Sequence, residues 1–568
     1  MSKISITHFN DVYRVTPQKF SNTSSETIDV SKFAGLLDSV RAQWENRPDG
    51  KKEGLTLFSG DAFSPSMEGS VIRGSHMTAV LNALGIDVAV AGNHDFDYGY
   101  PHFCKLTKDS AFPWLLSNII DENTGRVPVP LQELQVVERR GVRIGLIGLA
   151  EKQWIATLPS WPANFQHRDM AQVAIELSKK LRDTNGEYKC DIVLALTHCR
   201  LANDIQLAKD AYAFSPSAYD SLPSQHGVDL ILGGHDHDEG DSGDILLFKS
   251  GTDFREFSDV TIELQDAPEG CVRKKIIQAV HGKRQVTKPD SPSSNELQAV
   301  IGSQLSSVQA SSNSPVCKSA VELDLGRKSL RGGESSAGNW FADVLRHAYD
   351  DSPCMKGEGG SDGVIFCAGT LRGGSVYPPG NITLGNILEI LSYEDPVVVL
   401  ELTGQAIWDV MESTLSRYPA YEGRFPIISG FRVSWDSQRP AGQRVLGIWL
   451  QKDVANPKSN GVAVVDGDEI KPDKEGKKYK IVTREYLAQG NDGYSALIGH
   501  NYLIDDETGQ IMSSIVRKYL LGSHFINRLA RLRDSTKLLD SSTAAILSRE
   551  LEQRKHEADD HKSLIAAK

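Results

Sequence analysis

The sequence predicts an α/β fold made of more than one domain, and three observations support this. Short apolar runs alternate with segments of helical periodicity in the first half of the chain, as in layered sheets covered by helices. Five of these runs are followed at once by Asp, Asn or His side chains. The chain has 568 residues, more than one hydrophobic core usually supports, so two or three domains are expected.

The expected elements of the first domain follow one another along residues 1–285. Strands are predicted at residues 4–6, 55–58, 88–91, 142–149, 192–196 and 228–232, with closing strands at 260–264 and 274–280. Helices are predicted at residues 31–44, 78–84 and 170–181. The first of these helices has one apolar face, and either Asp29 or Ser31 suits its N-cap.

A change in composition marks the boundary between two domains. Residues 289–314 are rich in Ser, Asn and Gln, yet their apolar residues keep helical spacing from Leu297 to Leu305. We therefore expect a linker helix at 286–315, a second domain at 316–521 and a charged helical tail at 522–568. The tail fits a solvated helix or a disordered end, and a coiled interaction segment is the alternative.

The second domain is expected to mix helices and strands as well. Helices are predicted at residues 337–347 and after Gly404, and strands at 364–367, 397–402, 431–435 and 479–483. Residues 356–363 form a glycine-rich loop in this prediction. Residues 455–476 are polar, which indicates an excursion on the surface.

Composition excludes several classes of partner. The net charge of −12 argues against broad binding to nucleic acid polymers or to anionic membranes. No apolar run approaches the length needed to span a membrane. The N-terminus enters a strand pattern at once, so we expect no signal peptide. Seven scattered cysteines form no Cys-x-x-Cys pair, which favours reduced thiols and a location in the cytoplasm.

The stretch Gly92-Asn93-His94-Asp95-Phe96-Asp97 is the centre of a larger pattern. It follows an apolar strand and brings an amide, an imidazole and carboxylates to one place. Four other expected strands end in similar chemistry, at Asn10-Asp11, Gly60-Asp61, Thr197-His198 and Gly233-Gly234-His235-Asp236-His237. In open α/β sheets, ligands bind beyond the carboxyl ends of the strands, and all five motifs fall there.

These strand ends predict a metal site. Oxygen and imidazole ligands without thiolates suit Zn, Mn, Fe or Co, and two divalent ions need one carboxylate, here Asp61, to bridge them. Each residue alone also fits a helix cap, a turn or a core histidine, whereas six together favour metal ions. The six candidate ligands are Asp11, Asp61, Asn93, His198, His235 and His237.

His94 is a candidate catalytic residue rather than a ligand. If Asn93 points at an ion, the side chain of the next residue diverges from it. His94 is then available to protonate a leaving oxygen or to stabilise the transition state. Asp97 is close enough in sequence to orient the imidazole.

In this order, the five motifs resemble the calcineurin-like metallophosphoesterase domain, and in particular the 5′-nucleotidase family. The resemblance extends to about residue 265 and implies a four-layer α/β/β/α sandwich. It implies that Asp11, Asp61 and His237 hold a first ion, and that Asp61, Asn93, His198 and His235 hold a second. His94 and Asp97 fall on the catalytic dyad of the family.

One position departs from the family pattern. The first motif of the family is Asn-Asp-x-His, whereas this chain has Asn10-Asp11-Val12-Tyr13. Three roles for Tyr13 are open. It binds an ion as a phenolate, it donates a hydrogen bond to a metal-bound water, or it leaves that site with open coordination.

The second domain supplies candidate groups for an anionic, aromatic substrate. Arginine forks match phosphate oxygens, and aromatic faces stack on nucleobases. The residues are Arg327, Arg331 and Arg372, and Tyr393 and Tyr486 in two loops. Packing and surface ion pairs are the alternative roles.

Residues 316–510 resemble the 5′-nucleotidase C-terminal domain, which implies an α+β fold. By this resemblance the three arginines bind phosphate and substrate, and the two tyrosines replace base-stacking phenylalanines. Asp492 matches a ribose-binding Asp, and Asp395 stands where the family usually has Asn. The sequence Tyr393-Glu394-Asp395 replaces the usual Phe-Gly-Asn, so an extra carboxylate is expected near the nucleoside.

The expected function is a two-metal phosphohydrolase that removes phosphate from nucleoside 5′-monophosphates, with metal-bound hydroxide as nucleophile. Hydrolysis of nucleotide sugars or of 2′,3′-cyclic nucleotides is the close alternative. A nucleotide-binding regulator with an impaired metal site is the alternative from another class, and Tyr13 and Glu394 motivate it. An assembly subunit that uses the charged tail is a third. The sequence leaves the oligomeric state open.

Overall fold

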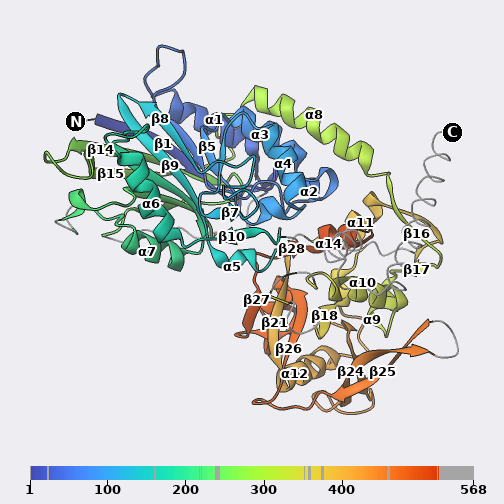
Figure 1. Ribbon diagram of the computed structural model, residues 1–568. Helices are drawn as coiled ribbons and strands as arrows, with labels where there is room; N and C mark the ends of the chain where they lie inside the picture. Colours follow the sequence, from blue (N-terminus) through green and yellow to red (C-terminus); the bar gives the residue numbers. More distant parts are fainter. Residues whose placement is uncertain are drawn as a thin grey trace.

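The protein has two domains joined by one long helix, α8 (Asn295–Ser311) (Figure 1). The structure is a computed structural model that describes residues 2–21, 25–158, 161–215, 218, 221–236, 244–350, 352, 354–355, 360–372, 376–393, 395–456, 461–520 and 522. In Figure 1 the first domain, blue to green, lies above and to the left of the second, which is yellow to red. The two-domain α/β architecture expected from the sequence is confirmed.

The first domain contains two sheets. One has the strand order β15-β14-β1-β4-β5-β6, in which β1, β4, β5 and β6 run parallel. Its strands are β1 (Ser2–Phe9), β4 (Leu55–Phe58), β5 (Val88–Val90), β6 (Trp114–Leu115), β14 (Glu256–Asp266) and β15 (Lys275–Val286). The parallel strands are mainly buried apolar runs, as expected for a sheet that is covered on both faces.

The second sheet has the order β13-β12-β11-β9-β8, with β9, β11, β12 and β13 parallel. Its strands are β8 (Leu134–Arg139), β9 (Val142–Ala150), β11 (Ile192–Cys199), β12 (Leu230–His235) and β13 (Leu247–Lys249). Apolar residues of both sheets, such as Leu57 and Leu194, form one buried cluster, so the sheets pack face to face.

Helices cover the two outer faces of the sheet pair. On the first sheet lie α1 (Val30–Arg41), α3 (Ser75–Leu84) and α4 (Tyr100–Lys108), and on the second lie α6 (Met170–Arg182) and α7 (Leu201–Asp210). Asp29 caps α1 by accepting the N–H groups of Ser31 and Lys32. The four-layer α/β/β/α sandwich is therefore confirmed.

The second domain is built around a six-stranded sheet. Its order is β22-β18-β26-β21-β27, and β28 also pairs with β21. The strands are β22 (Pro426–Ser429), β18 (Gly363–Cys367), β26 (Lys478–Arg484), β21 (Pro396–Thr403), β27 (Asn501–Ile504) and β28 (Gln510–Ile511). The helices α10 (Ser336–Arg346), α12 (Gly404–Leu415) and α14 (Met512–Leu520) bury their apolar residues in the same core.

One segment forms more regular structure than its composition indicates. Residues 455–476, expected as a polar excursion, include the end of β24 (Val445–Asn456) and all of β25 (Gly461–Glu469). These strands pair antiparallel and extend β23 (Phe431–Trp435) into a three-stranded sheet. Val464 and Val465 are 58% and 43% exposed. An exposed hairpin satisfies its backbone hydrogen bonds through strand pairing, so it needs no apolar face to form.

The remaining elements are short. They are β2 (Gln18–Lys19), β3 (Thr27–Ile28), α2 (Met67–Ile72), η1 (His94–Phe96), β7 (Ile119–Asp121), α5 (Lys152–Ile155), β10 (Phe165–His167), η2 (Leu222–Ser224), β16 (Pro315–Ser319), β17 (Leu323–Asp324), α9 (Arg327–Arg331), η3 (Ala368–Thr370), β19 (Val376–Tyr377), β20 (Gly380–Thr383), α11 (Leu384–Ile390), α13 (Glu485–Ala488), η4 (Asn491–Gly493) and η5 (Ser495–Leu497). Residues 356–359 of the expected glycine-rich loop, and the tail from residue 523, lie outside the described residues.

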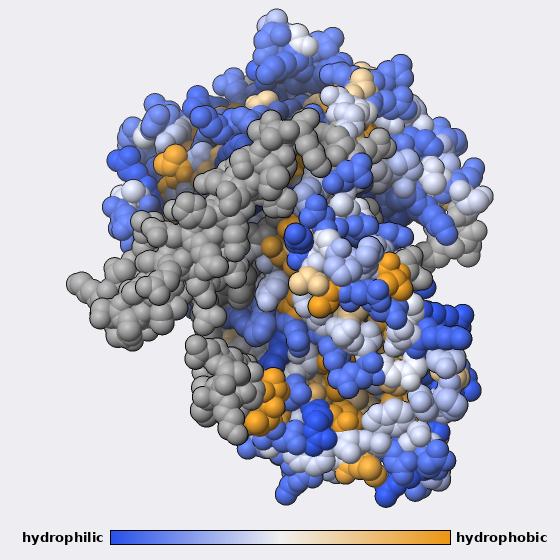
Figure 2. All heavy atoms as spheres, turned by 90° about the vertical axis from the view of Figure 1, so that its right-hand side faces the viewer, coloured by the Kyte–Doolittle hydropathy of each residue, from blue (hydrophilic) through white to orange (hydrophobic). Residues whose placement is uncertain are grey.

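Surface and thiols agree with the composition. All seven cysteines are free. Within the described chain, every helix is too short or too polar to cross a membrane. On the face shown in Figure 2, apart from what the grey atoms cover, hydrophilic side chains predominate and hydrophobic ones form small separate groups.

Candidate active site

Five of the expected metal ligands meet at the carboxyl ends of neighbouring parallel strands. Asp11 follows β1, Asp61 follows β4 and Asn93 follows β5, while His198 and His235 lie at the ends of β11 and β12. All five side chains are buried, with residue exposures of at most 1%. The sixth, His237, lies outside the described residues.

Three of these residues form a group that fits a metal ion. Ligand atoms of Asp61, His198 and His235 all lie within 4.8 Å of one another. Nε2 of His198 is 3.1 Å from Oδ2 of Asp61 and 3.0 Å from Oδ1 of Asn93. Nδ1 of His198 donates to the carbonyl of Ser59 at 2.7 Å, which leaves Nε2 to face the oxygens. A histidine that ligates a metal is commonly fixed by such a bond from its other nitrogen.

Unsatisfied buried atoms also point to a cation. Among the described residues, both ring nitrogens of His235 are buried without a hydrogen-bond partner. Buried polar atoms without partners are costly, and an ion would satisfy these. The residues present therefore fit a divalent metal.

The backbone at these ligands is locally strained. Asp11, Asp61 and His235 have φ angles of 51°, 64° and 83°, in the left-handed region that residues with a Cβ rarely adopt. Gly92 is required for close approach, since a Cβ there would lie 2.2 Å from Oδ1 of Asp61. Such strain is typical of functional sites, where geometry takes precedence over stability.

His94 and Asp97 form a buried pair beside this group. Nδ1 of His94 lies 3.0 Å from Oδ2 of Asp97, and its Nε2 lies 3.0 Å from the carbonyl of Glu507. Both nitrogens therefore face acceptors. Burial alone would lower the pKa of His94, but the Asp97 and Asp61 carboxylates outweigh it and raise this pKa to about 9. The ring is thus favoured as an imidazolium, a proton donor.

Asp95 has a positioning role that the sequence did not indicate. Its carboxylate accepts the N–H groups of Asp61, Ala62 and Gly92 at 3.1, 2.9 and 2.8 Å. It therefore ties the loop after β4 to the loop after β5. These two loops carry Asp61 and Asn93, so Asp95 fixes the spacing between two candidate ligands.

Tyr13 lies within the site, where its hydroxyl donates to Oδ1 of Asp11 at 3.1 Å. Its ring makes an edge contact with His94 at 6.0 Å between centroids. Burial, and then the Asp11 carboxylate, raise the pKa of Tyr13 well above its usual value. The Tyr13 phenol therefore lies next to Asp11, a proposed metal ligand, in its protonated form. Of the three roles considered for Tyr13, this arrangement does not match binding as a phenolate.

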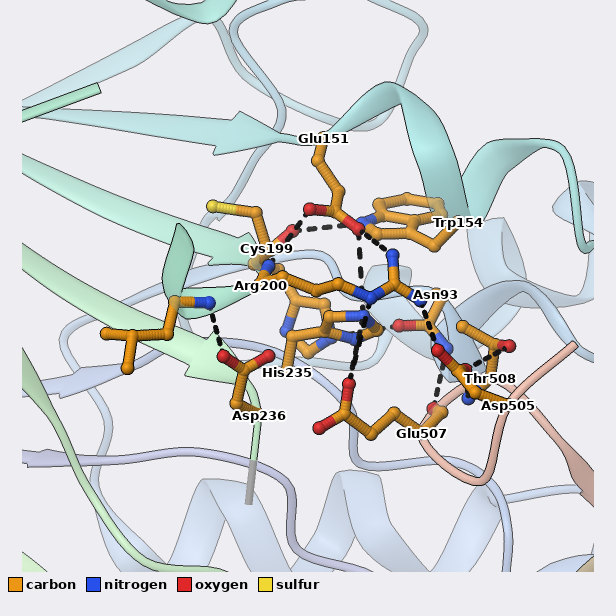
Figure 3. A network of polar contacts seen from close by, with 12 residues as sticks. Asn93, Glu151, Trp154, Cys199, Arg200, His235, Asp236, Asp505, Glu507 and Thr508 are labelled. Carbon is orange, nitrogen blue, oxygen red and sulfur yellow. Dashed lines mark hydrogen bonds and ion pairs between the residues drawn. The ribbon is translucent and has the colours of Figure 1, made fainter. Parts of the chain in front are cut away.

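A loop of the second domain enters the same site (Figure 3). The carbonyl of Glu507 accepts from Nε2 of His94, and from Nδ2 of Asn93 at 3.4 Å. Arg200, at the start of α7, bridges the domains through Glu151 at 2.7 Å and Asp505 at 2.5 Å. The sequence analysis did not single out Glu151, Arg200, Asp505 or Glu507, although Glu151 directly follows β9 and Arg200 directly follows β11.

The interface continues on the other side of His94. Gln510 and Lys518 of the second domain contact Asp97, with the Lys518 ammonium donating to its carbonyl at 3.0 Å. Ser352 donates to the carbonyl of Thr157 at 2.9 Å. In this arrangement the second domain closes over the candidate catalytic pair.

The expected substrate groups gather in the second domain. Arg327 and Arg331 lie on α9, and burial followed by the proximity of Arg327 and Arg372 lowers the pKa of Arg331. The Arg372 guanidinium lies 5.0 Å from the centre of the Tyr393 ring. Tyr486, which is 39% exposed, donates to Asp492 at 3.3 Å. This concentration of positive charge beside the half-buried Tyr393 ring and the exposed Tyr486 ring suits an anionic aromatic ligand.

Arg484 is a further residue of this cluster that the sequence did not indicate. It ends β26 and its guanidinium lies 4.5 Å and 5.7 Å from the ring centres of Tyr393 and Tyr486. Both of its outer edges are held: Nε and Nη2 bind Asp395, and Nη1 donates to Thr370 at 2.9 Å. Asp395 thus contacts Arg484, because β21 and β26 pair antiparallel at this position. Glu394, the residue before Asp395, lies outside the described residues. It was expected to bring an extra carboxylate near the nucleoside.

Comparison with known proteins agrees with this geometry. Residues 4–239 match the family described as Calcineurin-like phosphoesterase, and residues 311–498 match the 5'-nucleotidase, C-terminal domain. These matches identify a calcineurin-like phosphoesterase domain, which is a class of hydrolase domain, followed by a 5′-nucleotidase C-terminal domain. The chain has the two-domain composition of the 5′-nucleotidase family, and the resemblance recognised in the sequence is confirmed.

Named relatives share this composition. The chain is 23% identical to the 5'-nucleotidase of Homo sapiens over 91% of this chain and 88% of that one. It is 23% identical to a trifunctional nucleotide phosphoesterase protein of Bacillus subtilis, over 85% of this chain but only 32% of that protein. Two solved structures share the fold. The NAD nucleotidase of Haemophilus influenzae has a TM-score of 0.68 at 17% identity, with 92% and 96% of the chains covered. A 5'-nucleotidase precursor from Thermus thermophilus has a TM-score of 0.50 at 20% identity, with 92% and 97% covered.

Proposed function

We propose that the protein is a phosphohydrolase that uses two divalent ions to remove phosphate from nucleoside 5′-monophosphates. One observation carries this proposal. The buried group of Asp61, His198 and His235 lies beside the hydrogen-bonded His94–Asp97 pair, where strands of both sheets of the first domain end. A cation site and a proton donor in one small volume are what hydrolysis of a phosphate ester requires.

The first domain would supply the reacting groups. Asp11, Asp61, Asn93, His198, His235 and His237 are the residues proposed to hold the ions. Divalent ions bound there would lower the pKa of a water molecule and neutralise charge on the phosphoryl oxygens. His94 would pass a proton from Nε2 to the departing ribose oxygen, and Asp97 would stabilise the charged imidazole through Nδ1.

The second domain would bind the nucleoside. Tyr393 and Tyr486 are proposed to stack on the base, Asp492 to bind the ribose, and Arg327, Arg331 and Arg372 to attract the anion. The names of relatives, 5'-nucleotidase and NAD nucleotidase, support a nucleotide substrate. Since His94 is covered by Glu507 in this arrangement, the second domain has to move before substrate reaches it.

Phosphate release from purified protein tests the proposal. The protein is stripped of metal and then given Mn, Zn, Co or Fe, with nucleoside monophosphates, cyclic nucleotides and nucleotide sugars as substrates. Metal-dependent release that His94→Ala abolishes would support the hydrolase and rank its substrates. Retained nucleotide binding without release under any metal would instead support a nucleotide-binding regulator.

We further propose that the protein works in the cytoplasm. The seven free thiols support a reducing compartment. Fractionation of cells that express the native protein tests this, and recovery of a glycosylated secreted form would contradict it.

A further inference from the structure

The loop between β27 and β28 presents anionic groups to the candidate active site. Its residues Asp505, Asp506, Glu507 and Thr508 carry three carboxylates in a row. Asp505 is held by Thr508, whose N–H and hydroxyl donate to its Oδ1 at 3.1 and 2.7 Å. The loop therefore has a fixed shape, in which Asp505 and Glu507 face the first domain and Asp506 is exposed.

The groups that receive this loop are those that would receive a phosphate. His94 and Asn93 both donate to the Glu507 carbonyl, at 3.0 and 3.4 Å. Oε2 of Glu507 lies 3.8 Å from Nε2 of His235, a buried nitrogen without a hydrogen-bond partner in the described chain. Carbonyl and carboxylate oxygens thus occupy the space in front of one proposed metal ligand and the proposed proton donor.

Arg200 is the positive charge at the edge of this space (Figure 3). Its guanidinium binds Asp505 at 2.5 Å and lies 4.0 Å from Glu507. On its other side it binds the buried carboxylate of Glu151 at 2.7 Å, and its backbone N–H donates to the same side chain at 2.9 Å. Glu151 therefore anchors Arg200 in the first domain, whichever way the second domain moves.

We propose that the Asp505 carboxylate, together with the side chain and carbonyl of Glu507, occupies the phosphate subsite in place of the substrate anion, and that Arg200 binds the substrate phosphate once this loop withdraws. This inference rests on the proposed phosphohydrolase function. A guanidinium fork matches phosphate oxygens as well as it matches carboxylate oxygens. Movement of the second domain therefore exchanges one anion for another at Arg200, and the cation is not left without a partner.

The exchange has a measurable consequence for affinity. Phosphate binds only molecules whose loop has withdrawn, so its apparent affinity is reduced by the fraction that is open. Removing the loop charges should raise that fraction. Removing Arg200 should weaken phosphate binding even when the loop no longer competes.

Calorimetric titration of inorganic phosphate into the full-length, Mn²⁺-loaded protein tests both parts. The double variant Asp505→Asn/Glu507→Gln is expected to bind phosphate about tenfold more tightly than the wild type. The matched control is Asp506→Asn, which removes an exposed charge from the same loop and should stay within about twofold of the wild type. Adding Arg200→Ala to the double variant should weaken binding about tenfold again.

The outcomes are separable from those of the activity assay. Equal affinity in the wild type and the double variant, or equal gain in Asp506→Asn, would overturn the role of the loop. Arg200→Lys serves as a second variant if Arg200→Ala does not fold, since lysine keeps the charge but not the fork. Unchanged affinity in the Arg200 variants would overturn the role of Arg200. Because binding is measured without turnover, tighter phosphate binding in an inactive protein would uphold this inference and contradict only the proposed reaction.

Discussion

Nδ1 of His94 lies 3.0 Å from Oδ2 of Asp97, and the two side chains are only 2% and 3% exposed. Their local order follows from η1, which places residues three apart in sequence next to each other. The carboxylate favours the charged imidazole, and this charge makes His94 a proton donor in the proposed reaction.

Asp97→Asn should therefore lower kcat about 10²–10⁴-fold and change KM little, because the amide keeps the shape but not the charge. Phosphate release under saturating nucleotide measures this. Asp38→Asn is the control, since that carboxylate is 65% exposed on α1. Full turnover by Asp97→Asn would show that the pair takes no part in the reaction.

Removal of metal should abolish turnover, and Asp61→Asn should lower metal affinity by more than about 100-fold. Changes to groups that only support a ligand typically cost about 10–100-fold, and Asp61 is proposed as the bridging ligand itself. Mass spectrometry of the metal that remains bound after dialysis compares the metal affinities of the two proteins without an activity assay. Metal should also raise the melting temperature of the wild type, because it binds the folded state. Equal metal content in wild type and variant would contradict the assignment.

Arg484→Lys should raise the KM for nucleotide roughly three- to tenfold and leave kcat unchanged. Lysine keeps the charge but cannot bind Asp395 and Thr370 together. The side chain at position 484 would then no longer hold the Tyr393 and Tyr486 rings in place. Arg432→Lys is a matched control, because Arg432 forms a two-pronged pair with Asp466 on the exposed hairpin. A fall in kcat with unchanged KM would assign Arg484 to the reaction rather than to binding.

His76 should make the first domain sensitive to acid. It is fully buried in α3 without a hydrogen-bond partner in the described chain, and burial lowers its pKa from 6.5 to about 4. The unfolded chain therefore takes up the proton first as the pH falls below 6.5. The free energy of unfolding therefore falls as the pH is lowered from about 6.5 to 4. Through His76 alone it is about 2 kcal/mol smaller at pH 5 than at pH 8.

Urea denaturation at pH 8 and pH 5 measures this difference. His76→Leu should lose about 2 kcal/mol less than the wild type on acidification, because its side chain does not titrate. His281→Leu, at an exposed position, should follow the wild type. Identical losses in wild type and His76→Leu would show that His76 is not the responsible group.

Much of the fold was predictable from local patterns. The strand 55–58 has the predicted bounds, and the strand expected at 142–149 and the helix at 170–181 each extend one residue further, to Ala150 and Arg182. Buried parallel strands are continuous apolar runs, so their sequence signal is strong. The exposed hairpin of β24 and β25 was missed because it is held by strand pairing and not by a buried face.

Short local motifs were enough to predict which strand ends bring candidate metal ligands together, since each motif is a few residues long and ends or directly follows its strand. They were also enough to identify the His94–Asp97 pair, whose members are three residues apart. The folded arrangement was needed to find that Arg200 meets Asp505, 305 residues away, and that Arg484 meets Asp395, 89 residues away. These contacts depend on how strands pair and how the domains close. No local periodicity encodes them, because their partners become neighbours only when the chain has folded.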